Sequence, residues 1–115
     1  MQEPQITYRG MDHSPVLDAH IRDHTRKLLS FHPHITMCHV IVDERDRHKS
    51  KGNHFEIRVD LHVPGREIVA SLKEHEDPYV ALNQAFDAVM RQLEEDLERK
   101  RRQVKRHDGD DHTRP

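Results

Sequence analysis

The stretch HFEIRVDLHV, residues 54–63, decides the fold of this chain, because its apolar and polar side chains alternate without a break. Successive side chains of a β-strand point to opposite faces of a sheet, so this alternation predicts a strand with one buried face and one face in water. The buried face would carry Phe55, Ile57, Val59, Leu61 and Val63, and the wet face would carry Glu56, Arg58, Asp60 and His62.

Two further β-rich segments flank this strand. The segment ITMCHVIV, residues 35–42, is apolar on both faces, which is typical of a central and largely covered strand. The polar residues 43–53 (DERDRHKSKGN) that follow it predict a hairpin loop. Beyond the alternating strand, Pro64-Gly65 favours a tight turn. Residues 66–73 are then expected to return as a fourth strand, with Ile68, Ala70 and Leu72 as its apolar positions.

A first amphipathic helix is predicted to begin at Ser14-Pro15, with Ser14 as the N-cap and Pro15 at the first helical position. It should run to about Phe31, because Pro33 cannot continue a helix. Its apolar side chains recur at helical spacing and predict a stripe that faces the core. The stripe consists of Leu17, Ile21, Thr25 and Leu28.

A second helix is predicted from Asp77-Pro78 to about Arg106, with the same capping pattern. A helix of some 29 residues is about 43 Å long, whereas strands of eight to ten residues reach only about 26 to 34 Å. The C-terminal end of this helix must therefore extend beyond the rest of the domain. Its core stripe would be Leu82, Phe86, Val89, Leu93 and Leu97, with Ala85 and Met90 beside it.

The predicted elements give an α+β fold. With a short first strand at residues 6–9, closed by Gly10, the order becomes β-α-β-β-β-α. Two amphipathic helices can cover one face of a four-stranded mixed sheet and leave the other face in water. A chain of 115 residues suffices for one modest core. We expect one domain over residues 1–107 and a disordered polar tail, DGDDHTRP, over residues 108–115.

Charge is distributed unevenly along the chain. The formal net charge is only −2, but six of the 19 basic residues lie in residues 99–106, a segment without an acidic residue. The remaining 13 basic residues face 21 acidic ones, a net of −8. Such a concentrated positive field favours binding to a polyanion. The alternative is a solvated helix end, because a helix dipole favours cations at its C-terminus. One or two basic residues would satisfy that dipole, so six favour the first interpretation.

The composition also indicates where the protein works. No stretch approaches the ~20 apolar residues that span a bilayer, and the N-terminus MQEPQITYRG lacks the apolar run of a signal peptide. Cys38 is the single cysteine, so no intrachain disulfide can form and a reducing compartment fits. Its apolar neighbours favour a buried thiol over a nucleophile. The sequence therefore predicts a cytoplasmic protein with no membrane contact.

No motif predicts an enzyme or a cofactor. Neither a glycine-rich phosphate loop nor a nucleophile elbow is present. Of the twelve histidines, His20 and His24 are four residues apart on one helix and could clamp a metal, but no acidic or cysteine ligand completes the site at a matching spacing. Surface histidines that titrate near neutral pH are the favoured interpretation.

Motifs spread over about residues 4–105 resemble the hibernation-promoting factor and ribosome-associated inhibitor A family, also called sigma-54 modulation proteins. They are ITYRGM (6–11), SPVL (14–17), RKLLSF (26–31), HITMCHV (34–40), HVPGREIVAS (62–71), HEDPYVAL (75–82) and RQLE (91–94). The resemblance implies a fold similar to double-stranded-RNA-binding domains. It also implies binding between head and body of the small ribosomal subunit, on its rRNA, where tRNA and mRNA sites are blocked and translation is silenced in stationary phase or stress.

The resemblance also assigns site residues. Lys27 occupies the usual basic site of the first helix, with Arg22 and Arg26 beside it, and Arg91 carries over in the last helix. His24 stands where the family usually has Lys or Arg, and Ala88 where a Lys is common. Acidic residues at 94, 95, 96 and 98 occupy a stretch that is often basic, and the positive charge follows them instead. The predicted RNA-binding set is Arg22, His24, Arg26, Lys27, Arg91, Arg99, Lys100, Arg101, Arg102, Lys105 and Arg106.

These residue types suit RNA because ammonium and guanidinium groups release counterions from phosphates on binding. A phosphate near His24 would stabilise its protonated form and raise its pKa, so that binding strengthens as pH falls. The cations of segment 43–53 could reach a second RNA segment, or could belong to a solvated turn: Arg45, Arg47, Lys49 and Lys51.

Two other classes of function stay open, a protein-interaction modulator of a sigma factor or transcription, and a histidine-rich metal-binding protein. The resemblance is to short members of the family, which lack the C-terminal dimerisation domain of long members, so we expect the free protein to be a monomer. The resemblance also implies that short members allow ribosome pairing and that members with a longer tail block it. The tail here carries Asp108, Asp110 and Asp111, which RNA would repel, and this favours a role in promoting pairing.

Overall fold

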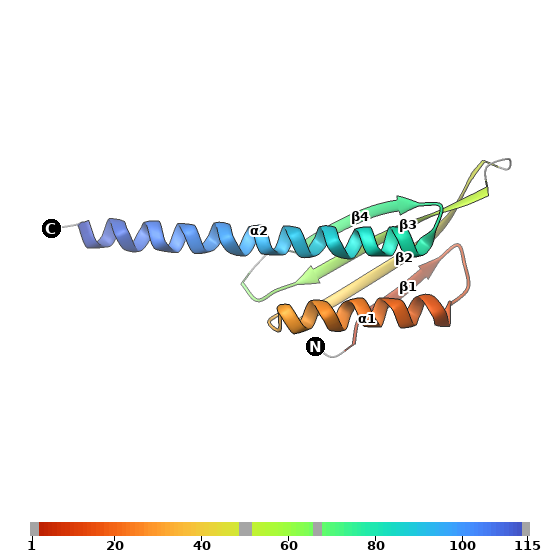
Figure 1. Cartoon of the computed structure of the whole chain (residues 1–115), viewed down its shortest axis with the longest axis horizontal. Coiled ribbons are helices and arrows are strands. Elements are labelled where there is room, and N and C mark those ends of the chain that lie inside the picture. Colours follow the sequence, from red (N-terminus) through yellow and green to blue (C-terminus); the bar gives the residue numbers. More distant parts are fainter. Residues whose placement is uncertain (1–2, 49–51, 66–67, 114–115) are drawn as a thin grey trace.

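The computed structural model describes the backbone of residues 3–48, 52–65 and 68–113, and the side chains of residues 3–45, 54–65 and 68–103. Its elements follow the predicted order β-α-β-β-β-α (Figure 1). They are β1 (Gln5–Arg9), α1 (Pro15–Phe31), β2 (Met37–His48), β3 (Gly52–His62), β4 (Val69–His75) and α2 (Pro78–Thr113). The four strands form one sheet in the order β1-β2-β3-β4. It is mixed, as predicted, because β1 pairs with β2 in parallel and the other pairs are antiparallel.

Both helices begin where their caps predict. The Ser14 hydroxyl accepts a hydrogen bond from the backbone N–H of Leu17 at 3.2 Å, and Pro15 follows in the first turn of α1. The Asp77 carboxylate accepts one from the backbone N–H of Tyr79 at 2.9 Å and so caps α2. Each bond satisfies one of the N–H groups that a helix start leaves without a partner inside the helix.

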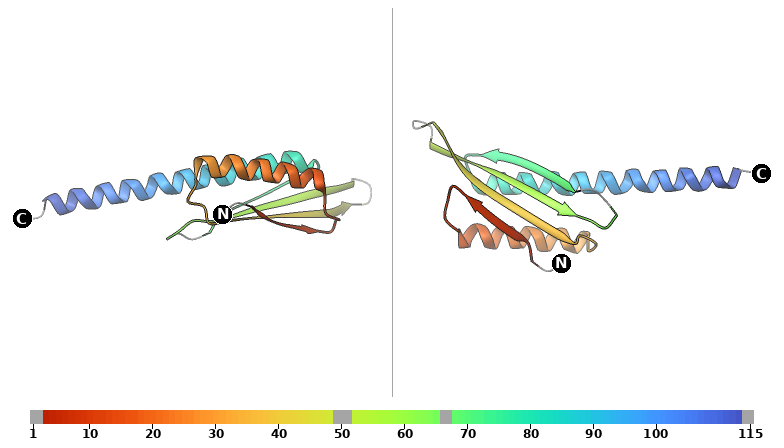
Figure 2. Two further views of the ribbon diagram at one scale, coloured as in Figure 1. Left: turned by 90° about the horizontal axis from the view of Figure 1, so that it is seen from below. Right: turned by 180° about the vertical axis from the view of Figure 1, so that it is seen from behind.

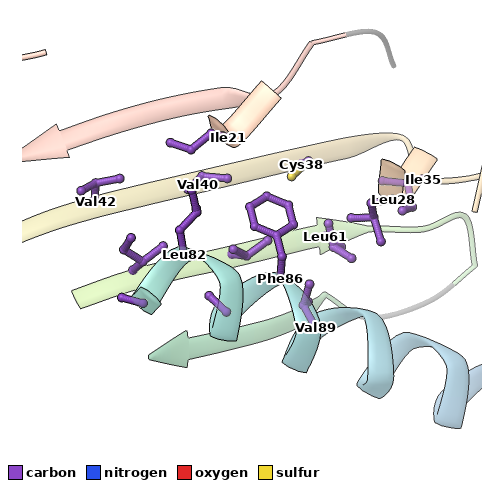
Figure 3. Close-up of a cluster of buried hydrophobic side chains, with 14 of the residues drawn as sticks. Ile21, Leu28, Ile35, Cys38, Val40, Val42, Leu61, Leu82, Phe86 and Val89 are labelled. Atoms are coloured by element: carbon purple, nitrogen blue, oxygen red, sulfur yellow. The ribbon is translucent and has the colours of Figure 1, made fainter. Parts of the chain in front are cut away.

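The hydrophobic core lies between the sheet and the two helices, which cover the same face (Figure 2). Figure 3 shows side chains from α1, β2, β3 and α2 meeting there, among them Ile21, Val40, Leu61 and Phe86. The predicted alternation is confirmed, since the four apolar positions of β3 and Val63 just after it turn to this core. Cys38 is also buried there, and burial raises the pKa of its thiol to about 11, which leaves it protonated and unreactive at neutral pH.

The prediction for β4 was wrong in its phase. Ile68 and Leu72 are 53% and 57% exposed, whereas Ser71 is buried and donates a hydrogen bond to the carbonyl oxygen of Ala85 in α2 at 2.6 Å. The reason is the register: Leu72 pairs with Arg58 of β3, whose side chain points away from the helices. Cross-strand partners share a face, so Leu72 lies on the outer face of the sheet as well.

The predicted hairpin loop over residues 43–53 was also wrong for most of its length. β2 continues to His48 and β3 starts at Gly52, with cross-strand pairs such as Glu44 with Phe55. A polar sequence does not end a strand by itself, because the backbone ladder can continue in water beyond the core. The register shifts between Asp46 and His48, so the two-stranded arm contains an irregularity near its tip.

α2 extends past the sheet and past α1, as its predicted length requires (Figure 1). Its 36 residues correspond to about 54 Å of helix. The backbone is helical to Thr113, so the helix does not end near Arg106. Within the part of the chain that the structure describes, no helix is both long and apolar enough to cross a membrane.

Candidate nucleic-acid interface

The predicted basic residues of α1 differ in whether their side chains already pair with a carboxylate. The Arg22 guanidinium donates to the Asp18 carboxylate at 3.0 Å and also pairs with Glu3. Arg26 pairs with Asp23 at 2.7 Å, with both side chains largely in water. Lys27 is exposed. Exposed ion pairs contribute little free energy, so Arg26 can exchange its carboxylate for a phosphate at low cost.

His24 lies at the contact between the two helices. Its Nε2 is 2.7 Å from Asn83 Oδ1, and its ring stacks on Phe86 with centroids 4.9 Å apart and planes 15° from parallel. Burial lowers the pKa of His24 below its ordinary value of 6.5, and the hydrogen bond to Asn83 opposes that shift less strongly. In the free protein at neutral pH the imidazole is therefore neutral, and its Nε2–H donates to Asn83.

The basic segment of α2 lies on the part of the helix that projects beyond the sheet. Arg99 and Arg102 pair with carboxylates one turn earlier, at 3.8 Å to Asp96 and 3.2 Å to Glu98. The acidic stretch before the basic segment thus partly neutralises it. The side chains of Lys105 and Arg106 lie outside the described residues. Among the predicted lysine and arginine site residues with described side chains, those without a carboxylate in ion-pair contact are Lys27, Arg91, Lys100 and Arg101.

The structure does not bring the α1 and α2 sets together in one patch. His24 contacts Asn83, and the basic segment begins at Arg99, sixteen residues further along α2. At ~1.5 Å per residue this separation is about 24 Å. The candidate interface therefore consists of two basic regions, one on α1 beside the first half of α2, and one at the projecting end of α2 (Figure 1).

One basic residue of the site was missed by the sequence. Lys73 of β4 and Arg91 of α2 line the same open depression of about 330 Å³, together with Gln84, Asp87 and Ala88. Lys73 belongs to the strand face of Ser71, which turns to α2. If Ser71 and Lys73 had been assigned to the face of β4 that turns to α2, Lys73 would have been placed beside Arg91.

The cations of the β2–β3 arm form no site among the described side chains. Arg45 is engaged by carboxylates of its own arm, with its guanidinium 3.3 Å from Glu56 and 3.4 Å from Asp43. The other three predicted cations of the arm, at positions 47, 49 and 51, lie outside the residues with described side chains.

Comparison with known proteins gives the same fold and family. The chain is similar to the N-terminal domain of Protein Y from Thermus thermophilus, with a TM-score of 0.66 and 16% identity over 81% of this chain and 96% of that one. It is also similar to a ribosomal subunit interface protein from Coxiella burnetii, with a TM-score of 0.62 and 22% identity over 81% and 94%. Residues 5–102 match the family described as Sigma 54 modulation protein / S30EA ribosomal protein. Both the predicted fold and the resemblance of the motifs are thereby confirmed, and the chain belongs to the Sigma 54 modulation protein / S30EA ribosomal protein family.

Proposed function

We propose that this chain is a cytoplasmic ribosome hibernation factor. In this proposal it binds the rRNA of the small subunit at the tRNA and mRNA sites and stops translation in stationary phase or stress, without catalysing a reaction. Membership of a family whose description includes a ribosomal protein supports it. So does the likeness to a protein described as a ribosomal subunit interface protein, although that likeness by itself shows only the fold.

The observation that carries the proposal is the projecting basic end of α2. Figure 1 shows no strand or other helix of the described residues beside this end of α2, so it can approach a folded RNA from several sides. Its cations with described side chains, residues 99–102, do not belong to the buried core. Arg101 and Lys100 have no carboxylate in ion-pair contact among the described residues, so RNA phosphates need not displace a partner from them. Folded RNA is recognised mostly by shape and backbone, which suits a rigid domain with separate basic regions.

The α1 region would supply the second contact. Among the described residues, Lys27 offers an ammonium group without a carboxylate in ion-pair contact, and Arg26 offers a guanidinium held by an exposed ion pair. The carboxylates of Asp18 and Glu3 hold Arg22 more firmly, so we assign it a weaker role than the other two. Arg91 and Lys73 add two basic side chains at the depression that β4 and α2 line together.

Salt dependence of binding to purified small subunits tests the proposal. Each phosphate contact adds about 0.7 to 0.9 to the slope of log affinity against log salt. Changing Arg101, Arg102, Lys105 and Arg106 together to Gln should flatten this slope and weaken binding. Unchanged affinity and slope would show that the segment is only a solvated helix end.

A matched control separates contact from net charge. The double variant Arg101→Gln/Arg102→Gln and the double variant Arg9→Gln/Arg58→Gln remove the same charge, but Arg9 and Arg58 line a depression on the sheet face away from the helices. Only the first should change the slope. Equal losses in both would mean a diffuse electrostatic attraction and would contradict a defined contact.

The transcriptional alternative makes a different prediction for the same cells. A modulator of a sigma factor would co-purify with RNA polymerase, whereas a hibernation factor sediments with ribosomal particles on a sucrose gradient. Recovery of the chain only in polymerase fractions of a stationary-phase extract would overturn the proposal.

A further inference from the structure

His54 is a buried histidine at an unusual place, the outer face of the sheet. It precedes Glu56 by two residues in β3 and therefore shares the face of the sheet that the helices do not cover. Only 8% of His54 is exposed, and its Nδ1 has no hydrogen-bond partner in the described chain. The other ring nitrogen, Nε2, faces a carboxylate of the neighbouring strand instead.

Two carboxylates lie beside this imidazole. Glu56 of β3 and Glu74 of β4 are directly opposite each other across the strand pair. Like charges at this position repel each other, and a cation bound between them would reduce that repulsion. Arg45 already offsets part of it at Glu56, and Glu74 has a further contact besides His54. One ligand atom from each of His54, Glu56 and Glu74 can be chosen so that all three lie within 4.8 Å of one another. Next to them, His54 and Glu74 line an open depression of about 390 Å³.

The separation of two of these atoms fits a tetrahedral metal ion. His54 Nε2 and Glu74 Oε2 are 3.4 Å apart, longer than the 2.7 to 2.9 Å of a good charge-assisted hydrogen bond. Two ligands bound at about 2.1 Å to a tetrahedral ion are themselves about 3.4 Å apart. We propose that His54, Glu56 and Glu74 bind a divalent transition-metal ion, Zn²⁺ first among them, with water completing the coordination. This proposal does not rest on the proposed function.

The donor set decides the class of ion. An imidazole nitrogen with two carboxylate oxygens suits a borderline ion such as Zn²⁺, whereas Mg²⁺ and Ca²⁺ prefer oxygen alone. His75, next to the same depression, is not a ligand in this arrangement. Its Nδ1 accepts a hydrogen bond from the backbone N–H of Asp77 at 2.9 Å, so the neutral ring carries its proton on Nε2 and has no lone pair left for a metal.

Arg45 competes with the ion for one ligand. Its Nε lies 3.3 Å from Glu56 Oε2, on the strand next to β3. A metal at the site must share Glu56 with this guanidinium or displace it. Removing the guanidinium by Arg45→Gln should therefore strengthen metal binding, an outcome that a simple network of ion pairs does not predict.

The test is a Zn²⁺ titration of the metal-free full chain against a chromophoric chelator, with Mg²⁺ as a comparison. We expect one site in the wild type that prefers Zn²⁺ to Mg²⁺. Loss of a mere outer-shell partner typically weakens a metal site ten- to a hundredfold, so His54→Gln, Glu56→Gln and Glu74→Gln should each weaken it by at least about tenfold. Zn²⁺ should also raise the Tm of the wild type and not that of Glu74→Gln.

The control is His62→Gln, which removes another histidine from the same strand and the same face, outside the cluster. It should bind Zn²⁺ as the wild type does, and Arg45→Gln should bind more tightly. Circular dichroism shows whether each variant folds. If His54→Gln does not fold, the variants of the two more exposed glutamates test the proposal. Wild-type affinity in Glu56→Gln and Glu74→Gln, or no tighter binding of Zn²⁺ than of Mg²⁺, would overturn the proposal and leave a pair of ordinary ion pairs.

Discussion

At the scale of single residues, His24 has two roles, one expected from the sequence and one seen in the fold. The family resemblance placed it on the RNA-binding surface. The structure places it at the α1–α2 contact, hydrogen-bonded to Asn83 and stacked on Phe86. Burial lowers its pKa in the free protein. An RNA phosphate would raise it again in the complex, so binding would be accompanied by proton uptake at this ring.

The lowered pKa of His24 predicts a loss of stability in acid. Above the unfolded pKa of about 6.5 both states are neutral, and this group has no effect. As the pH falls below that value, the unfolded chain takes up the proton before the folded one, so stability falls with it. His24→Gln keeps a hydrogen-bonding group and cannot titrate. The drop in Tm between pH 7.5 and 5.5, measured by circular dichroism, should be smaller in this variant. An equal drop in both proteins would contradict the prediction.

The sequence predicted which residue types carry charge but not which charges are already engaged. Arg22 and Lys27 look alike in the sequence, yet one is held by two carboxylates and the other has no partner among the described residues. The His54 cluster was missed for a related reason, because its ligands come from two strands and meet only when the register of β3 with β4 is known. Side-chain pairing across strands is set by register, which one strand's pattern does not contain.

At the scale of elements, the helices were predictable because their signals are local. Caps and apolar spacing at Ser14 and Asp77 fix the starts of α1 and α2 within the segments themselves. The buried face of β4 was harder to predict, because the segment offers two alternating sets of side chains. In the sequence Ile68, Ala70 and Leu72 are more apolar than Val69, Ser71 and Lys73. The pairing with β3 decides which of the two sets faces the core. Because Arg58 of β3 faces water, the residue opposite it does too.

The junction between β1 and α1 contains a glycine that cannot be replaced without cost. Gly10 ends β1 with φ at +69°, and a Cβ there would lie 2.4 Å from the Glu44 carbonyl oxygen of β2. Gly10→Ala must therefore both strain the backbone and push two strands apart. We expect the free energy of unfolding, measured in urea, to fall by an amount in the upper part of the range of about 1 to 3 kcal/mol.

Gly65→Ala is the matched control for that substitution. Gly65 has the same φ of +69°, but a Cβ there would meet no atom of the described residues within 4 Å. Only the backbone strain remains, so its loss of stability should be clearly smaller than that of Gly10→Ala. Equal losses would show that the close approach to Glu44 is relieved without cost.

At the scale of the whole molecule, the prediction concerns the end of α2. The tail predicted from residue 108 is acidic, and RNA would repel it unless it points away. The helical backbone to Thr113 lets it point away along the axis of α2 (Figure 1). Deleting residues 108–115 should therefore leave small-subunit affinity and ribosome pairing unchanged, as measured by sedimentation on sucrose gradients. Much more pairing with the truncated chain would instead identify the segment as an inhibitory arm and reverse the proposed role in pairing.

The long helix also changes how this protein behaves in a size measurement. A compact chain of 115 residues should have a radius of gyration of about 13 Å. The observed value is 17.8 Å, which a compact chain would reach only at about 245 residues. The monomer that we expect will thus leave a gel-filtration column early and imitate a dimer. Methods that measure mass, such as sedimentation equilibrium or native mass spectrometry, will report one chain. The frictional coefficient will be higher than that of a compact protein of the same mass, because the long helix elongates the particle.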